Sequence, residues 1–220
     1  MQYENAMGKT LLYTGFSLLL TLIGFILGML LIPPEMANSL STILLITMLI
    51  LTVVLFISLR KKQNLRFPMW YVYIYAFVEG IILYPVILSY LATIGVTIVL
   101  TVFIGTILWV AILGFIALKS NGKFLGIGKI LIIGLIVELI LTLFGIFFFS
   151  NLTMVIISCF GVLIFSGYVL YDISLIKKCE EEGFIQERDD LSIFVLNVYL
   201  DIINLFSRLL RIVSYFLNRD

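Results

Sequence analysis

Seven long apolar runs dominate the sequence, and they constrain its fold more than any other feature. Each run has about twenty residues or more, the length that an α-helix needs to cross the hydrocarbon core of a bilayer. The runs are continuous rather than alternating, so they predict helices and exclude a transmembrane β-barrel. The predicted spans lie at about 11–32, 40–59, 67–90, 93–118, 127–149, 152–176 and 191–217. We therefore predict an all-α membrane protein with one integral membrane domain over residues 1–220.

The composition agrees with this fold class and narrows the chemistry. Apolar residues make up 62% of the chain and charged residues 12%, whereas a soluble domain carries about 45–50% and 25%. A net charge of +1 is too small for a nucleic-acid-binding face, so we exclude nucleic acid and expect lipid as the partner. The chain has no histidine. Proton chemistry near neutral pH therefore has to use carboxyl groups, and imidazole ligation of a metal is not available.

Lysine and arginine occur in alternate loops, which predicts the topology. The loops at 60–66, 119–129 and 177–190 carry four, three and three of them, and the loops between carry none. The positive-inside rule places these loops and the N-terminus in the cytoplasm. The chain shows no targeting tail, so we expect a bacterial inner membrane. The basic residues of the last helix strain the rule, and we favour a full span within the bundle over a re-entrant or interfacial helix.

Four acidic residues lie inside apolar spans: Glu79, Glu138, Asp172 and Asp201. Each costs a few kcal/mol in lipid, so each is expected to face the interior of the bundle, where functional residues of membrane proteins concentrate. Glu138 shares a helix face with Gly134, Thr142 and Gly145, so a structural role in close helix packing is favoured for it.

The last span carries one polar stripe on an otherwise apolar helix. Its members recur at spacings of 4, 3, 4 and 3, which places them on one face. They are Asn197, Asp201, Asn204, Arg208 and Arg211. Such a stripe is expected to face a polar cavity or partner carboxylates. The alternative is a helix that lies on the membrane surface.

A second carboxyl group is available to meet Asp201. Asp172 lies near the predicted cytoplasmic end of the sixth span, four residues after Tyr168 on the same face. Two carboxyl groups that lie close together in a low-dielectric site share a proton and titrate as a pair, which makes a pH-sensitive latch. The alternative is that Asp172 and Asp201 never meet and that each neutralises a neighbouring lysine or arginine.

Three short segments resemble one family of membrane proteins. They are Gly167-Tyr168-Val169-Leu170-Tyr171-Asp172, then Tyr199-Leu200-Asp201-Ile202-Ile203-Asn204-Leu205-Phe206, and Phe77-Val78-Glu79-Gly80 with Pro85 downstream. They are similar to the paired signature and third helix of the transmembrane Bax inhibitor motif proteins, the Bax inhibitor-1 family, especially its bacterial members. The resemblance implies a central seventh helix surrounded by six others, and a pH-sensitive calcium leak across the membrane.

The resemblance also implies roles for individual residues. Asp172 and Asp201 match the family's proton-sharing sensor, and Arg60 matches the basic residue that latches it, with Lys61 or Lys62 as alternatives. Glu79, Asn197, Asn204 and Arg208 remain as residues of the pore or polar stripe. Calcium prefers six to eight oxygen ligands, so the two aspartates offer only a weak and transient site. Calcium is thus expected as the permeating ion, and no cofactor is expected.

Two other classes of function stay open at the level of sequence. Tyr171-Asp172 resembles the first half of the signature of an intramembrane aspartyl protease, but Asp201 lacks the surrounding glycines of the second half. We therefore predict that the protein is not an enzyme. A non-transporting regulator that binds other membrane proteins, such as a membrane protease or a cell-death factor, is the main alternative. A proton-coupled antiporter is a variant of the leak, distinguished by saturable exchange.

Overall fold

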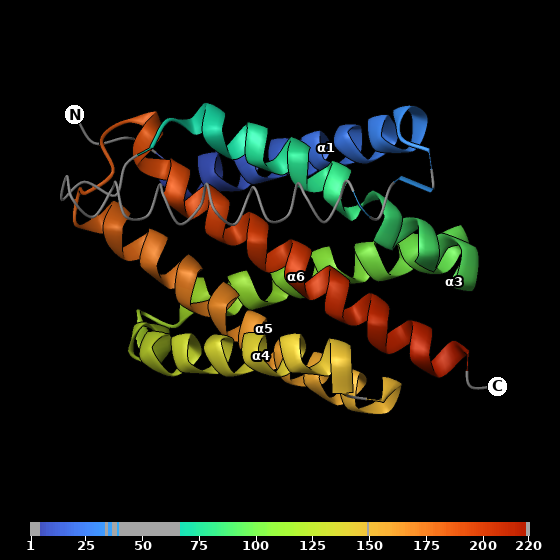
Figure 1. Cartoon of the computed structure of the whole chain (residues 1–220). Helices are drawn as coiled ribbons and strands as arrows, with labels where there is room; N and C mark the ends of the chain where they lie inside the picture. The colour runs from blue at the N-terminus through green and yellow to red at the C-terminus, as the bar shows by residue number, and fades with distance from the viewer. Residues whose placement is uncertain (1–4, 34, 37–38, 40–66, 149, 219–220) are drawn as a thin grey trace. The chain divides into compact units, whose positions relative to one another are not determined.

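The computed structural model describes residues 5–33, 35–36, 39, 67–148 and 150–218, and the regular structure among them is all helical (Figure 1). The long helices are α1 (Ala6–Leu31), α3 (Met69–Lys119), α4 (Gly128–Phe148), α5 (Asn151–Glu181) and α6 (Ser192–Leu217). Short 3₁₀ helices, η1 (Lys123–Ile127) and η2 (Arg188–Leu191), precede α4 and α6. The predicted all-α class is confirmed for these residues.

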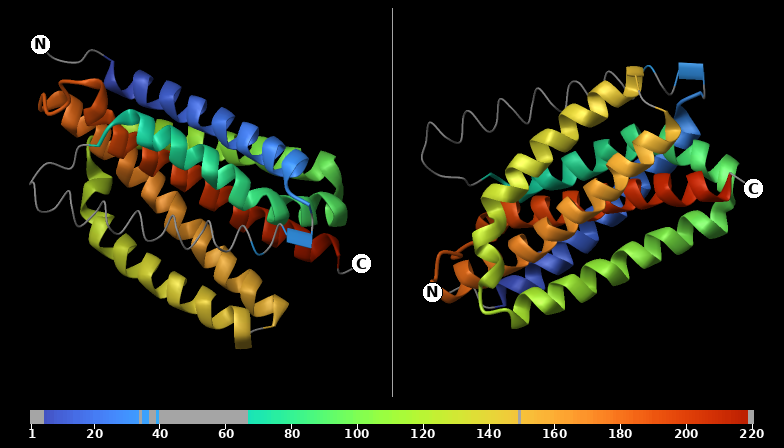
Figure 2. Two further views of the ribbon diagram at one scale, coloured as in Figure 1. Left: turned by 45° about the horizontal axis from the view of Figure 1, so that its top comes forward. Right: turned by 90° about the horizontal axis from the view of Figure 1, so that it is seen from below.

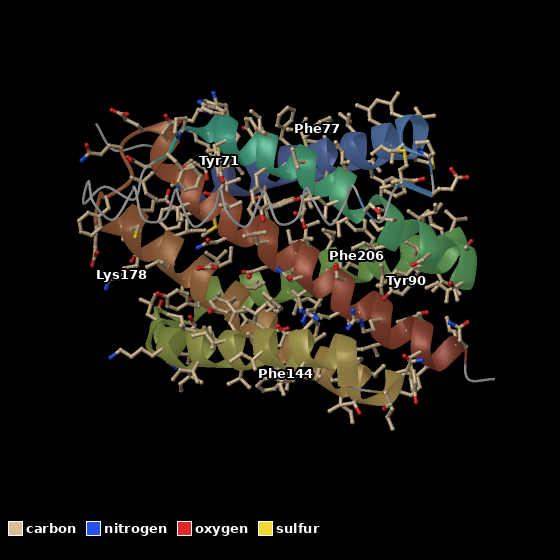
Figure 3. All side chains as sticks on the ribbon, viewed as in Figure 1. Tyr71, Phe77, Tyr90, Phe144, Lys178 and Phe206 are labelled. Carbon is tan, nitrogen blue, oxygen red and sulfur yellow. The ribbon has the colours of Figure 1, made fainter. Side chains whose placement is uncertain are left out.

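Most predicted boundaries lie within two residues of the observed ones, and the exceptions are the start of α1, the end of α5 and the break inside α3. The first helix begins at Ala6 rather than near residue 11, and the Asn5 side chain accepts a hydrogen bond from Gly8 N at 3.1 Å. Helix α5, which corresponds to the sixth predicted span, continues to Glu181 rather than ending near residue 176. Its last turn contains Lys177, within 3.9 Å of Glu181, and Lys178, labelled in Figure 3, within 3.8 Å of Glu182. Such pairs one turn apart favour continued helix, so the predicted charged loop is shorter than expected.

Helix α3 contains an internal break that the sequence analysis placed a few residues too early. Its 51 residues would extend about 76 Å if straight, more than twice the thickness of the hydrocarbon core of about 30 Å. Gly95 interrupts the helix with φ 81° and ψ 160°, a conformation that residues with a Cβ rarely adopt. The predicted break between residues 90 and 93 was therefore wrong in position. Two helical arms result, residues 69–94 and 96–119.

Five helical segments of the described residues are long and apolar enough to cross a membrane. They comprise α1, α3, residues 123–142, α5 and residues 188–217. The chain is therefore an integral membrane protein, and the two arms of α3 raise the number of potential crossings to six. The predicted span at 40–59 lies outside the described residues, so the count of seven stays a prediction.

The last helix is the most enclosed of the five. In its most apolar stretch 56% of the residues are buried, against 39% or less in the others. A helix at the centre of a bundle is expected to have a high fraction of buried residues, as this helix has. The arrangement of six helices around it stays a prediction.

The chain divides into two compact units. The first comprises residues Met1–Ser89 and Gly183–Tyr199, and the second comprises Tyr90–Glu182 and Leu200–Asp220. Both α3 and α6 contribute residues to each. The single membrane domain predicted for residues 1–220 stays a prediction.

In the first unit, α1 packs closely along the first arm of α3 (Figure 2). A Cβ on Gly24 would overlap the carbonyl oxygen of Phe77, and a Cβ on Gly80 would overlap that of Thr21. Thr21 also joins α1 to α6, because its hydroxyl lies 2.8 Å from the Tyr199 hydroxyl. Small residues thus let the helix backbones approach, as is common in membrane proteins.

In the second unit, α4 and α5 form an antiparallel pair whose register is set by glycines (Figures 1 and 2). A Cβ on Gly128 would lie 2.8 Å from a ring carbon of Tyr171, and a Cβ on Gly134 would lie 3.3 Å from Ile164. On the other helix, a Cβ on Gly167 would lie 2.6 Å from Leu131. Each of these glycines on one helix therefore accommodates a large side chain of the other.

Further contacts join the rest of the second unit. The ring of Phe206, labelled in Figure 3, packs edge-on against Phe103 of α3 with centroids 5.4 Å apart. The Trp109 indole donates a hydrogen bond to the Ser166 hydroxyl at 3.0 Å. Helix α6 and the second arm of α3 are therefore in direct contact, and α5 contacts that arm as well.

Candidate functional site

The structure brings Asp172 and Asp201 together. Asp172 projects from α5 and Asp201 from α6, and their side chains form a hydrogen bond. The two residues are only 3% and 4% exposed. Tyr168, one turn before Asp172, is near enough to interact electrostatically with both carboxyl groups. The alternative that the two aspartates never meet does not hold, whereas their role as a sensor stays a prediction.

The chemistry of this acid pair follows from the identity of its two groups. Two ionised carboxylates have only acceptor atoms, so a hydrogen bond between them requires a proton on one of them. The hydrogen-bonded pair therefore holds at least one proton. Asp201 Oδ2 has no hydrogen-bond partner among the described residues, which leaves one oxygen of this pair unsatisfied in a buried place.

A second buried pair, which the sequence analysis did not identify, joins α4 to α6. Arg208 Nη2 lies 2.6 Å from Glu138 Oε1, and the Glu138 side chain is 3% exposed. The Thr142 hydroxyl donates a hydrogen bond to the same oxygen at 3.3 Å. A Cβ on Gly161 of α5 would lie 3.2 Å from that oxygen and 3.3 Å from Arg208 Nε, so this glycine leaves room for the ion pair.

The sequence contained a signal for this second pair. Glu138 is the only acidic residue of its span, and the arginines of the last helix had no assigned counter-charge. Charges inside a membrane protein pair with one another. The structural role favoured for Glu138 agrees with its contacts. For Arg208, the carboxylate of Glu138 is a partner of the kind expected for the polar stripe, and a role in a pore stays a prediction.

The other predicted residues lie in three places. Asn204 belongs to the second unit, and its amide donates to the Leu200 carbonyl of its own helix at 2.8 Å. Glu79 and Asn197 belong to the first unit. There Glu79 is near enough to interact electrostatically with Tyr75 and Tyr199. Arg60 lies outside the described residues.

The metal-binding capacity of the described residues is small. They contain no group of three or more histidine, cysteine, aspartate or glutamate side chains placed to hold a metal ion. The acid pair supplies two carboxyl groups, and calcium prefers six to eight oxygen ligands. Any calcium at this pair would depend on water for most of its coordination.

Together these features define a class: a polytopic helical membrane protein with a buried pair of aspartates on two of its helices. Residues 4–218 match the model of the family described as inhibitor of apoptosis-promoting Bax1, and this match spans nearly the whole chain. The protein therefore belongs to the Bax inhibitor-1 family, which confirms the resemblance seen in the sequence.

Proposed function

We propose that this protein is a pH-sensitive calcium leak channel whose gate is the Asp172–Asp201 pair. The observation that carries the proposal is the hydrogen bond between two buried carboxyl groups on different helices. Such a contact depends on a single proton, so a change in pH acts directly on the junction between α5 and α6. Membership of the Bax inhibitor-1 family supports it.

The magnitude of the charge effect is sufficient for a gate. Two full negative charges about 4 Å apart repel by about 4 kcal/mol at an effective dielectric constant of 20. Loss of the shared proton replaces a hydrogen bond with this repulsion, which favours separation of the helices. We propose Arg60 as the latch that offsets the charge of the pair in one state.

Calcium in this proposal is a permeating ion. Two carboxylates, water and amide oxygens form a weak site, and a weak site lets an ion leave as well as enter. Of the residues predicted for the pathway, Asn204 and Arg208 are held in internal contacts. All four residues predicted for the pore or polar stripe, Glu79, Asn197, Asn204 and Arg208, stay predictions.

The test is calcium uptake into dye-loaded proteoliposomes over a range of pH values. The wild type is compared with Asp172→Asn and Asp201→Asn, and Glu181→Gln is the matched control, because this exposed acid lies near the end of the same helix as Asp172. We expect pH-dependent uptake in the wild type and the control. Either asparagine variant is expected to lose that dependence, because an amide donates to the remaining carboxylate without a titrating proton.

A folded, reconstituted protein that passes no calcium at any pH contradicts the channel proposal. The non-transporting regulator would then take its place. We also propose that the protein is not an enzyme. Cleavage of a membrane substrate by the wild type that is lost in both asparagine variants would contradict this proposal.

We also propose a bacterial inner membrane with a cytoplasmic N-terminus. The support is the distribution of lysine and arginine among the loops. Labelling of single cysteines introduced at Lys9 and Lys123 by a membrane-impermeant reagent tests it. Both positions are expected to react only after the membrane is permeabilised.

A further inference from the structure

The buried ion pair belongs to a cluster with more positive than negative charge. Arg208 and Arg211 lie three residues apart on α6, and Arg211 is near enough to interact electrostatically with Arg208. Glu138 is the carboxylate that pairs with Arg208. The cluster formed by these three residues thus holds two guanidinium groups and one carboxylate.

Two hydrogen-bond donors in this cluster have no acceptor among the described residues. Arg208 Nε and Arg211 Nη1 are both buried and have no hydrogen-bond partner among the described residues. Both nitrogens carry hydrogens, because a guanidinium group is always charged and acts only as a donor. A buried donor without an acceptor is destabilising, and more so when it is charged.

Within the described part of the chain, the groups around the cluster do not supply acceptors for these two nitrogens. Glu138 Oε1 already accepts from Arg208 Nη2 and from the Thr142 hydroxyl. The Tyr90 phenol, labelled in Figure 3, is near enough to interact electrostatically with Arg208, and a phenol is able to donate to an anion as well. Among the described residues, the cluster therefore offers several donors and one positive charge without a counter-charge.

We propose that Arg208 and Arg211 bind a singly charged anionic group between Arg208 Nε and Arg211 Nη1. The group is either the phosphodiester of an anionic lipid or a free inorganic anion, since both present acceptor atoms and one negative charge. Its binding makes the net charge of the cluster zero. A water molecule would also accept hydrogen bonds from these donors, but it would leave the net positive charge unchanged. This site is separate from the aspartate pair and does not depend on the calcium proposal.

The experiment measures the melting temperature of the purified full chain in two arms that use different probes. In the lipid arm, nanodiscs of phosphatidylcholine are compared with nanodiscs that contain increasing phosphatidylglycerol. In the free-anion arm, chloride replaces gluconate at constant ionic strength in phosphatidylcholine nanodiscs. We expect a saturable rise in melting temperature in one arm, and that arm identifies the source of the anion.

Variants assign the effect to the cluster. Arg211→Gln removes the excess charge and is expected to raise the half-saturating concentration by about tenfold or more. Arg211→Lys keeps the charge but not the guanidinium geometry, so a smaller increase is expected. Lys123→Gln, an exposed lysine of η1, is the control and is expected to behave as the wild type.

Two outcomes overturn the proposal. One is the absence of a saturable rise in both arms, and the other is an equal rise in the wild type and Arg211→Gln. If Arg211→Gln does not fold, the comparison of Arg211→Lys with the wild type decides, and identical half-saturation in those two proteins overturns the proposal as well.

Discussion

Two buried pairs of ionisable side chains hold the helices of the second unit together. One pair consists of two acidic groups, and the other of an acidic and a basic group. Asp172 and Asp201 are like groups that join α5 to α6, and Glu138 and Arg208 are opposite charges that join α4 to α6. The two aspartates and Glu138 are almost fully removed from solvent, whereas the Arg208 side chain is 15% exposed. The first contact exists only while a proton is shared, whereas the second exists with both groups ionised.

This difference means that one contact in the second unit depends on pH and the other does not. A carboxyl pair changes its charge when the pH moves through its titration range. An arginine stays charged at every pH that a folded protein meets, so its ion pair with a carboxylate persists over most of that range. We therefore expect pH to act at the junction of α5 and α6 and to leave the junction of α4 and α6 unchanged.

Removal of one partner from the opposite-charge pair is expected to have the largest effect. Glu138→Gln leaves the Arg208 guanidinium buried without its counter-charge, and such losses typically cost about 3–5 kcal/mol. The free energy of unfolding in mixed micelles measures the loss. Glu181→Gln, whose side chain is 65% exposed, is the control and is expected to change it by less than about 0.5 kcal/mol. A loss below about 1 kcal/mol in Glu138→Gln would show that the ion pair does not hold α4 to α6.

Removal of both partners sharpens the same point. Glu138→Leu combined with Arg208→Met replaces the ions with apolar side chains, a change that is often neutral or stabilising. The double variant is expected to be more stable than the sum of the two single losses predicts, with a coupling of about 2 kcal/mol or more from the double-mutant cycle. Strict additivity would mean that the two side chains act independently.

The like-charge pair is expected to make stability depend on pH. Separate exposed carboxyl groups are ionised at neutral pH, whereas the folded pair holds one proton, so unfolding releases that proton. Stability therefore falls as pH rises through the titration of the pair, by at most about 1.4 kcal/mol per pH unit. Unfolding measured at several pH values is expected to show this slope in the wild type and a flat profile in Asp201→Asn. If the slope disappears in Glu138→Gln and persists in Asp201→Asn, the pH dependence comes from the Glu138–Arg208 pair, and the prediction is contradicted.

The smallest effect is expected at the glycine beside the ion pair. Gly161→Ala places a methyl group within 3.4 Å of Glu138 and Arg208 atoms, and the crowding is expected to cost about 1 kcal/mol. Gly105→Ala is the control, because a Cβ there would contact nothing within 4 Å. Helix propensity predicts that the control is neutral or more stable, by up to about 1 kcal/mol. Melting temperatures of the two variants give the comparison.

The sequence predicted the helices of the described residues, and it offered the aspartate pair as one of two alternatives. Lipid satisfies no backbone hydrogen bond, so each long apolar run has to be helical. Asp172 and Asp201 became candidates because a carboxyl group inside an apolar span is costly in lipid, and the family resemblance favoured their pairing over contacts with lysine or arginine. The Glu138–Arg208 pair was missed because, although Glu138 and Thr142 mark one face of α4, the sequence does not fix which helix that face meets. The break at Gly95 was placed early because backbone conformation at a glycine is not encoded in hydropathy.

The glycines between α4 and α5 limit how the acid pair is able to move. Each of Gly128, Gly134 and Gly167 faces a bulky residue of the other helix. A slide of one turn would bring bulky side chains against each other, so relative translation of these two helices is blocked. A displacement of Asp172 by translation of α5 along its axis would therefore carry α4 with it. A nitroxide pair placed across α4 and α5 is expected to keep a constant separation when pH is changed through the titration of the proposed gate.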